Sequence, residues 1–162
     1  DIESCARLGC DGVVLGVLDS AGCVDVAGCQ VLVAAAGTMG VTFHRAFDCV
    51  AERHAALDAV VALGCDRVLT SGSADSAELG AAVIAGDIAH AAGRVSLMPG
   101  AGLTPRNIAV VARATGAGEL HASAREFQPG IGREGPAGLA RSYWRSSEAT
   151  VRLLREALDA SA

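Results

Sequence analysis

The sequence predicts an α/β fold with a parallel sheet, built from repeated strand–helix units. Three observations predict it. Short β-rich apolar runs begin near residues 12, 41, 67, 94 and 119, and stretches with helical spacing lie between them. A glycine stands just past the end of these stretches, as is common at helix C-termini. Alternation of strands and helices at a near-constant period is typical of βαβ units.

The expected elements follow one another along the chain. Residues 1–8 resemble the later part of a helix that Gly9 ends. Strands are expected over residues 12–18, 41–47, 67–72, 94–98 and 119–124, and helices over residues 51–63, 76–92, 105–115 and 148–160. Thr104 and Pro105 mark the start of one helix, because Thr caps helices and Pro fits the first helical position.

Two architectures fit five such units in one domain over residues 1–162. A TIM (βα)8 barrel needs about 250 residues, so this chain would supply five of its eight repeats and lack the N-terminal three. A complete five-stranded doubly wound sheet also fits the length. Residues 126–141 interrupt the alternation of strands and helices, because they are rich in Gly and Pro. We expect a flexible loop there, either a lid or a disordered segment.

Composition and charge exclude several classes of protein. The formal net charge is −5, which disfavours a surface that grips nucleic acid through its phosphates. No apolar run is long enough to span a membrane. The cysteines form no C-x-x-C pair, so zinc and thioredoxin spacings are missing. We expect them to be reduced thiols of a cytoplasmic protein; they are Cys5, Cys10, Cys23, Cys29, Cys49 and Cys65.

Polar side chains are expected to converge at the carboxyl ends of the strands. Side chains alternate between the two faces of a strand, so Thr42 and His44 share one face, and His121, Ser123 and Arg125 share one face. In parallel α/β folds, ligands bind where the strands end. We expect a site there, although a buried His alone is more often structural and Arg45 with Asp48 could be a plain salt bridge. The candidate catalytic residues are His44, Arg45, Asp48, His121 and Arg125.

A glycine-containing turn at residues 99–105 joins a strand to a helix start. Glycines let backbone N–H groups approach an anion, and a helix N-terminus adds positive potential. Together with the polar end of the next strand, this turn predicts an anion site. The candidate substrate-binding residues are Ser71, Gly72, Gly100, Gly102 and Ser123.

Five ordered motifs resemble the CutC family of copper homeostasis proteins. They are DGVVLGVL (11–18), TFHRAFD (42–48), RVLTSG (67–72), MPGAG (98–102) and HASAR (121–125). The resemblance implies a TIM barrel of which this chain holds the last five strands, a cytoplasmic location and copper as the bound ion. The family's proposed Cu(I) ligands belong to the three absent strands. We therefore assign no copper ligand to this chain's cysteines, which lie outside the shared motifs.

Three functions remain open at this point. The resemblance implies copper binding. The residues themselves favour a barrel enzyme for a small anionic or phosphorylated metabolite, in which Arg45 and Arg125 hold the anion and His44 or His121 moves a proton. Alternatively, the chain has no activity by itself, and the exposed sheet edge left by missing strands causes it to form a homo-oligomer.

Overall fold

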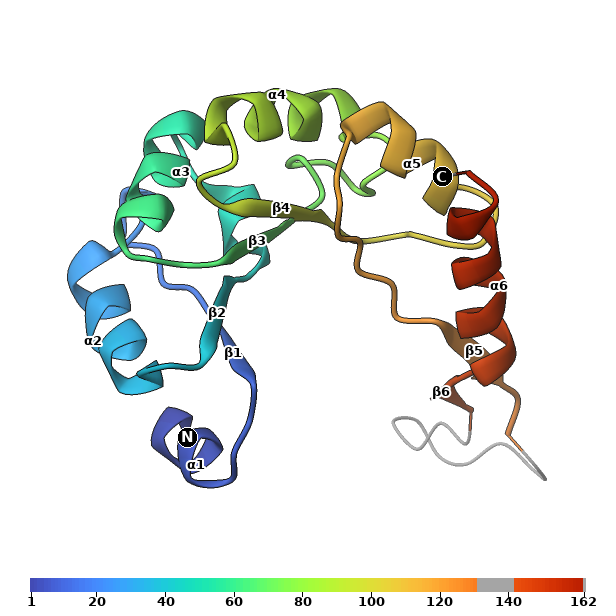
Figure 1. Cartoon of the computed structure of the whole chain (residues 1–162), viewed down its shortest axis with the longest axis horizontal. Coiled ribbons are helices and arrows are strands. Elements are labelled where there is room, and N and C mark those ends of the chain that lie inside the picture. Colours follow the sequence, from blue (N-terminus) through green and yellow to red (C-terminus); the bar gives the residue numbers. More distant parts are fainter. Residues whose placement is uncertain (131–141, 162) are drawn as a thin grey trace.

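The structure is a computed structural model, and it describes residues 1–130 and 142–161. Strands line the inside of an open arc, and helices follow its outside (Figure 1). The strands are β1 (Gly12–Leu15), β2 (Gly40–Phe43), β3 (Arg67–Thr70), β4 (Ser96–Pro99), β5 (Arg125–Gln128) and β6 (Tyr143–Ser146). The helices are α1 (Ile2–Arg7), α2 (Val26–Ala36), the 3-10 helix η1 (Arg45–Cys49), α3 (Arg53–Ala62), α4 (Ala81–Ala91), α5 (Ile108–Thr115) and α6 (Glu148–Asp159).

The main sheet is parallel, and its strands lie in the order β1-β2-β3-β4. The order in space follows the order in the chain, which is the arrangement of a (βα)n barrel. A doubly wound sheet instead reverses its strand order and carries helices on both faces. The α/β prediction is thus confirmed, and the doubly wound alternative is wrong. The described residues form an arc and close no barrel (Figure 1).

The core lies between the convex face of this sheet and the helices. Val41 and Phe43 of β2 are buried, whereas Thr42 between them is only half-buried. Their burial follows from the alternation of side chains along a strand. The same core takes in Leu57 and Val60 of α3. A second core joins α4, α5 and α6 through residues that include Ile84, Ile108, Val111 and Leu154.

The prediction of a regular fifth strand over residues 119–124 is wrong. Only one parallel bridge forms there, between His121 and Gly100, and the His121 N–H donates to the Pro99 carbonyl at 2.9 Å. Ala124 then adopts a left-handed φ of 45°, which takes the backbone out of the extended region. Strand β5 starts directly after it and pairs antiparallel with β6.

Two other expectations need correction. The loop expected over residues 126–141 begins later, because residues 126–128 belong to β5, and its central part lies outside the described residues. Helix α5 starts at Ile108, because the Thr104 N–H bonds to Asn107 Oδ1 at 2.8 Å and the preceding residues form a turn. Helix α6 confirms the expected closing helix. No helix within residues 1–130 and 142–161 has the length and apolar character needed to cross a bilayer.

The two faces of the sheet should respond differently to truncation. Phe43 is fully buried against the helices, whereas Val14 on the concave face is 64% exposed. We expect Phe43→Ala to lower the free energy of unfolding of this chain by about 3–5 kcal/mol, because it leaves a cavity in the core. Val14→Ala should change it by less than about 0.5 kcal/mol. Urea denaturation followed by circular dichroism measures both; equal losses would contradict this assignment of the faces.

Candidate functional site

A cavity of about 560 Å³ opens at the carboxyl end of the sheet, and we call it the mouth cavity. It is lined by Arg45, Leu69, Trp144, Thr150 and residues 101–105 and 121–125. Two of these residues are arginines and none is acidic. A cavity with two guanidinium groups and no carboxylate in its lining is suited to an anion.

Half of the predicted site residues line this cavity. Arg45, Gly102, His121, Ser123 and Arg125 are all part of its wall. Arg45 follows β2, Gly102 follows β4, and the other three come from the segment that bridges to Gly100 and enters β5, so residues far apart in sequence meet at this cavity. The predicted alternation of side chains over residues 120–125 is also observed, because the apolar residues Leu120, Ala122 and Ala124 pack on the second core.

The turn at residues 99–105 shapes the cavity, because Gly100 has no side chain to fill the space beside Leu69 and His121. A Cβ added to Gly100 would lie 2.5 Å from Leu69 Cδ1 and 3.4 Å from His121 Cβ. Gly100 therefore does not line the cavity itself but leaves room for two residues that do. Gly102 has a φ of +72° and Ala101 a φ of +83°, so two successive left-handed residues bend the backbone around the cavity. The left-handed region suits Gly and strains Ala.

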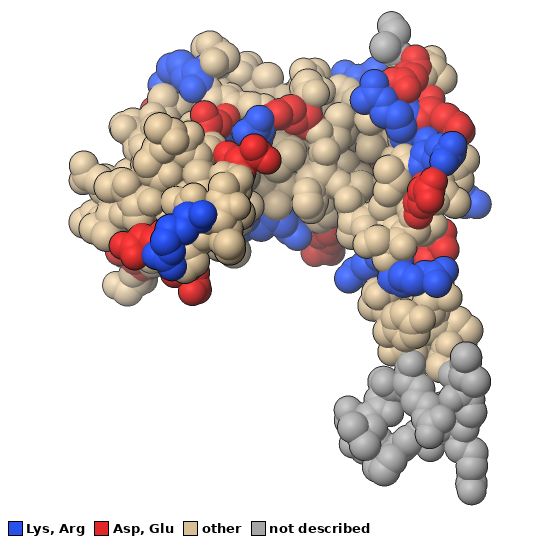
Figure 2. All heavy atoms as spheres, turned by 60° about the horizontal axis from the view of Figure 1, so that its bottom comes forward, with Lys and Arg blue, Asp and Glu red and all other residues tan. Residues whose placement is uncertain are grey.

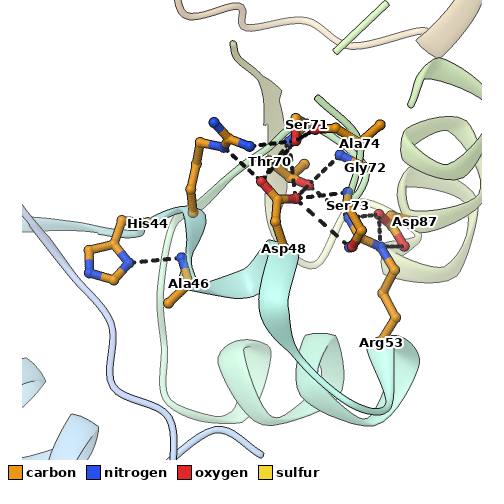
Figure 3. A network of polar contacts seen from close by, with 11 residues as sticks. His44, Ala46, Asp48, Arg53, Thr70, Ser71, Gly72, Ser73, Ala74 and Asp87 are labelled. Carbon is orange, nitrogen blue, oxygen red and sulfur yellow. Dashed lines mark hydrogen bonds and ion pairs between the residues drawn. The ribbon is translucent and has the colours of Figure 1, made fainter. Parts of the chain in front are cut away.

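Asp48 lies beside the cavity and positions one of its arginines. Its carboxylate accepts hydrogen bonds from Arg45 Nε at 2.7 Å, Thr70 Oγ1 at 2.6 Å and the backbone N–H of Ser73 at 3.1 Å. The backbone N–H of Ser71 also donates to it. Figure 3 shows Asp48 at the centre of this network, between η1 and the segment that follows β3. The predicted salt bridge of Arg45 and Asp48 therefore exists and also fixes Arg45 at the cavity.

Ser71 and Gly72, predicted to bind substrate, belong to this network and not to the cavity wall. Arg45 Nη2 donates to Ser71 Oγ at 2.7 Å. Gly72 is needed for close packing, because a Cβ there would lie 2.5 Å from the Gly80 carbonyl oxygen. Ser71 thus helps to orient Arg45, and Gly72 allows the segment after β3 to pack closely against Gly80.

A second ion pair anchors the network to the helices. Arg53 of α3 donates to Asp87 of α4, with its Nη2 at 2.7 Å from Asp87 Oδ2, and to Thr70 Oγ1 at 2.7 Å. Its guanidinium carbon also lies 4.5 Å from the centre of the Phe47 ring. Asp87 is buried, so this pair is shielded from water. This pair was not predicted, because Arg53 and Asp87 belong to different helices and no local pattern links them.

His44 and His121 lie on the same concave face of the sheet. A Cβ on Gly16 would lie 2.8 Å from the His44 ring, just as one on Gly100 would approach His121. His44 does not line the mouth cavity, and its Nδ1 accepts the Ala46 N–H at 3.2 Å, so it caps η1. Figure 3 shows its ring turned away from Asp48.

A polar cluster near the amino ends of the strands was not predicted. Arg67 Nε lies 2.9 Å from both oxygens of Glu119, and Ser96 Oγ donates to the same carboxylate at 2.7 Å. The hydroxyl of Ser96 and then the Arg67 guanidinium hold the pKa of Glu119 below its usual value. The cluster joins β3, β4 and the segment before the Gly100–His121 bridge, at the opposite end from the mouth cavity.

The donor groups for a metal ion are sparse. Within the part of the chain that the structure describes, no three His, Cys, Asp or Glu side chains come together as a potential metal site. All six cysteines are free thiols.

The charge of Asp48 should make stability depend on pH. Burial tends to raise the pKa of Asp48, but the hydrogen bonds from Thr70, Arg45, Ser73 and Ser71 outweigh burial and lower it. Its contribution is therefore complete above the unfolded pKa of about 3.9 and is lost as the pH falls through the folded pKa. We expect Asp48→Asn to destabilise the chain by about 2 kcal/mol at pH 7.

Urea titrations at pH 7 and at successive pH values below 4 test this expectation. The difference between Asp48→Asn and the unmutated chain should shrink toward low pH. Asp159→Asn is the matched control, because its exposed ion pair with Arg155 should contribute less than about 1 kcal/mol. A difference that stays constant down to the acid limit would show that the Asp48 charge does not stabilise this fold.

The chain is similar to bacterial proteins named CutC. The family protein CutC of Xylella fastidiosa (strain Temecula1) is 58% identical over 125 residues, which are 77% of this chain and 47% of that protein. The Chromobacterium violaceum CutC is 49% identical over 98% of this chain and 68% of its own length. The chain thus spans about half the length of the Xylella relative.

Solved structures share its fold. A CutC crystal structure from Streptococcus agalactiae, whose name assigns it a proposed role in copper homeostasis, has a TM-score of 0.71 at 29% identity and covers 74% of this chain and 59% of its own. A second solved structure, described as "Native KDPGal structure", has a TM-score of 0.62 at 16% identity over 99% of this chain and 64% of its own, and shows the fold alone. The CutC family profile matches residues 1–126, so the chain belongs to the CutC family.

Proposed function

We propose that the mouth cavity binds a small anionic metabolite that carries a phosphate or carboxylate group. One observation supports this most: Arg45 and Arg125 line a single cavity that has no acidic residue in its wall. Ser123 and the turn at Gly102 add hydroxyl and backbone donors to the same wall. Charge-assisted hydrogen bonds of this kind are about twice as strong as neutral ones.

The two arginines would act differently on the ligand. Arg45 is already oriented by Asp48 and Ser71, so little side-chain freedom remains to be lost when it binds. Arg125 lies over the Trp144 ring, with its guanidinium carbon 4.5 Å from the ring centre, which holds the group flat at the cavity wall. The arrangement favours an organic anion with an apolar part, because Leu69, Leu103 and Trp144 complete the wall.

For an enzymatic role, His121 is the group that could move a proton. It lines the cavity, and an imidazole ring can both accept and donate a proton. His44 lies on the same face outside the cavity, so its role would be to shape η1 and thereby place Arg45. The chain contains no Lys, so Schiff-base catalysis through a lysine of this chain is not part of the proposal.

Binding of inorganic phosphate measured by calorimetry tests the cavity. Arg125→Gln and Arg45→Gln should each raise the Kd by about tenfold or more, because each removes charge-assisted hydrogen bonds. Arg152→Gln removes the same charge from an exposed position on α6 and should leave the Kd unchanged. Absence of phosphate binding, or equal losses in all three variants, would refute the anion site.

A second candidate function is copper handling in the cytoplasm. The name of the Streptococcus relative supports it, since that name concerns copper homeostasis. Metal analysis of the protein after anaerobic loading with Cu(I) should show copper in near-stoichiometric amounts. If the protein binds phosphate but no copper, copper handling is refuted and anion binding remains as the proposed function.

A further inference from the structure

The exposed Phe, Tyr and Trp residues of this chain all lie on one hairpin. The sequence contains three Phe, one Trp and one Tyr. Phe43 and Phe47 are fully buried in the main core. The other three, Phe127, Tyr143 and Trp144, lie on β5 and β6, and each of them is 55% exposed. A chain with few aromatic residues thus presents three of them to solvent on the element that borders the mouth cavity.

Phe127 and Trp144 form a pair on one face of this hairpin, and we call them the aromatic pair. They stand directly opposite each other in the register of β5 and β6. Their ring centres are 5.4 Å apart, and the ring planes meet at 70°. Because side chains alternate between the faces of a strand, Arg125 shares the face of the aromatic pair and Tyr143 lies on the other face.

The aromatic pair continues the wall of the mouth cavity. Trp144 and Arg125 both line the cavity, whereas Phe127 lies next to Trp144 outside the wall. The guanidinium carbon of Arg125 is 4.5 Å from the centre of the Trp144 ring. Figure 1 shows the hairpin at the opposite end of the arc from α1. A cation that suits an anion and an exposed aromatic surface therefore lie side by side at the mouth.

Stabilisation of the hairpin explains only part of this arrangement. A cross-strand aromatic pair does stabilise two antiparallel strands. Both rings nevertheless remain more than half exposed, so much of their apolar area stays in contact with water. Two rings set nearly perpendicular present a ring face and a ring edge next to each other, and aromatic rings pack favourably against both. A ligand ring placed there would remove this area from water.

We propose that the aromatic pair binds a planar ring of the anionic ligand, so that the mouth cavity takes an aromatic phosphate or carboxylate. The inference rests on the anion site proposed above and narrows the class of its ligand. An anion at Arg125 and a ring against Trp144 are within the reach of one small molecule, because the two side chains are in contact. The cavity of about 560 Å³ falls in the usual range for pockets that hold small organic ligands.

Calorimetry with two matched anions tests this proposal. Phenylphosphonate and methylphosphonate carry the same anionic group and differ in the ring. The unmutated protein should bind phenylphosphonate about tenfold more tightly, which is comparable with the stacking of one base on an aromatic side chain. Phe127→Leu and Trp144→Leu should each remove most of this preference. Phe127→Leu should leave the Kd of methylphosphonate unchanged, because Phe127 is not part of the cavity wall.

Tyr143→Leu is the matched control. Tyr143 is as exposed as Phe127 and belongs to the same hairpin, but its side chain lies on the other face. This variant should keep the tenfold preference, and circular dichroism checks that each variant is folded. Trp144 is the single Trp of the sequence, so its fluorescence reports on the proposed site. Phenylphosphonate should shift its emission to shorter wavelengths, because the ligand ring excludes water from the indole.

The outcomes distinguish the ring site from the anion site. Equal Kd values for the two phosphonates would overturn the ring site and leave the anion site standing. No binding of either phosphonate would overturn both. Phenylphosphonate binding without any change in Trp144 emission would place the ring elsewhere and overturn the proposal. If Phe127→Leu converts a dimer to a monomer in light scattering while the preference persists, the aromatic pair is an interface between copies and not a ligand site.

Discussion

The carboxylate of Asp48 is the interaction on which the mouth of this structure depends. It is almost fully buried, and it joins η1 to the backbone that follows β3 through hydrogen bonds with Thr70, Ser71 and Ser73 (Figure 3). An unpaired buried carboxylate would be costly, so the segments that supply its donors must stay in place. Its remaining bond orients Arg45 toward the cavity. The same contact thus stabilises the fold and prepares one of the two cations of the proposed anion site.

Much of the sheet could be predicted because strand alternation is local information. The burial of Val41 and Phe43 and the opposite placement of Thr42 follow from the sequence pattern alone. The prediction of a fifth strand was wrong because the chain turns at Ala124 into β5, whose partner β6 begins only at Tyr143, and a local sequence pattern does not report such a pairing. Helix α2 was not predicted, because its run of small apolar residues has no clear polar face. Asp25, whose side chain accepts the Gly28 N–H at 2.9 Å, was the available signal for its start.

The candidate site was predictable where it follows from the ends of strands. His121, Ser123 and Arg125 were expected on one face and do line one cavity. Trp144 was not expected, because the long Gly/Pro-rich segment separates it from Arg125 in sequence while the hairpin sets its ring against that side chain. The two ends of the sheet carry different groups, the mouth cavity at the carboxyl ends and the Arg67–Glu119 ion pair near the amino ends.

Positive and negative side chains are mixed over the face of the molecule in Figure 2, so any selectivity for anions must come from the cavity and not from that surface as a whole.

The proposed anion site requires the guanidinium groups of Arg45 and Arg125, which are far apart in sequence, to converge on one anion. A crystal structure of this protein grown or soaked in sulfate tests it most directly. We expect tetrahedral density in the mouth cavity, within hydrogen-bonding distance of the Arg125 guanidinium and the Gly102 backbone, with Arg45 still held by Asp48. An ordered mouth that contains no sulfate, while sulfate binds elsewhere on the protein, would contradict the account.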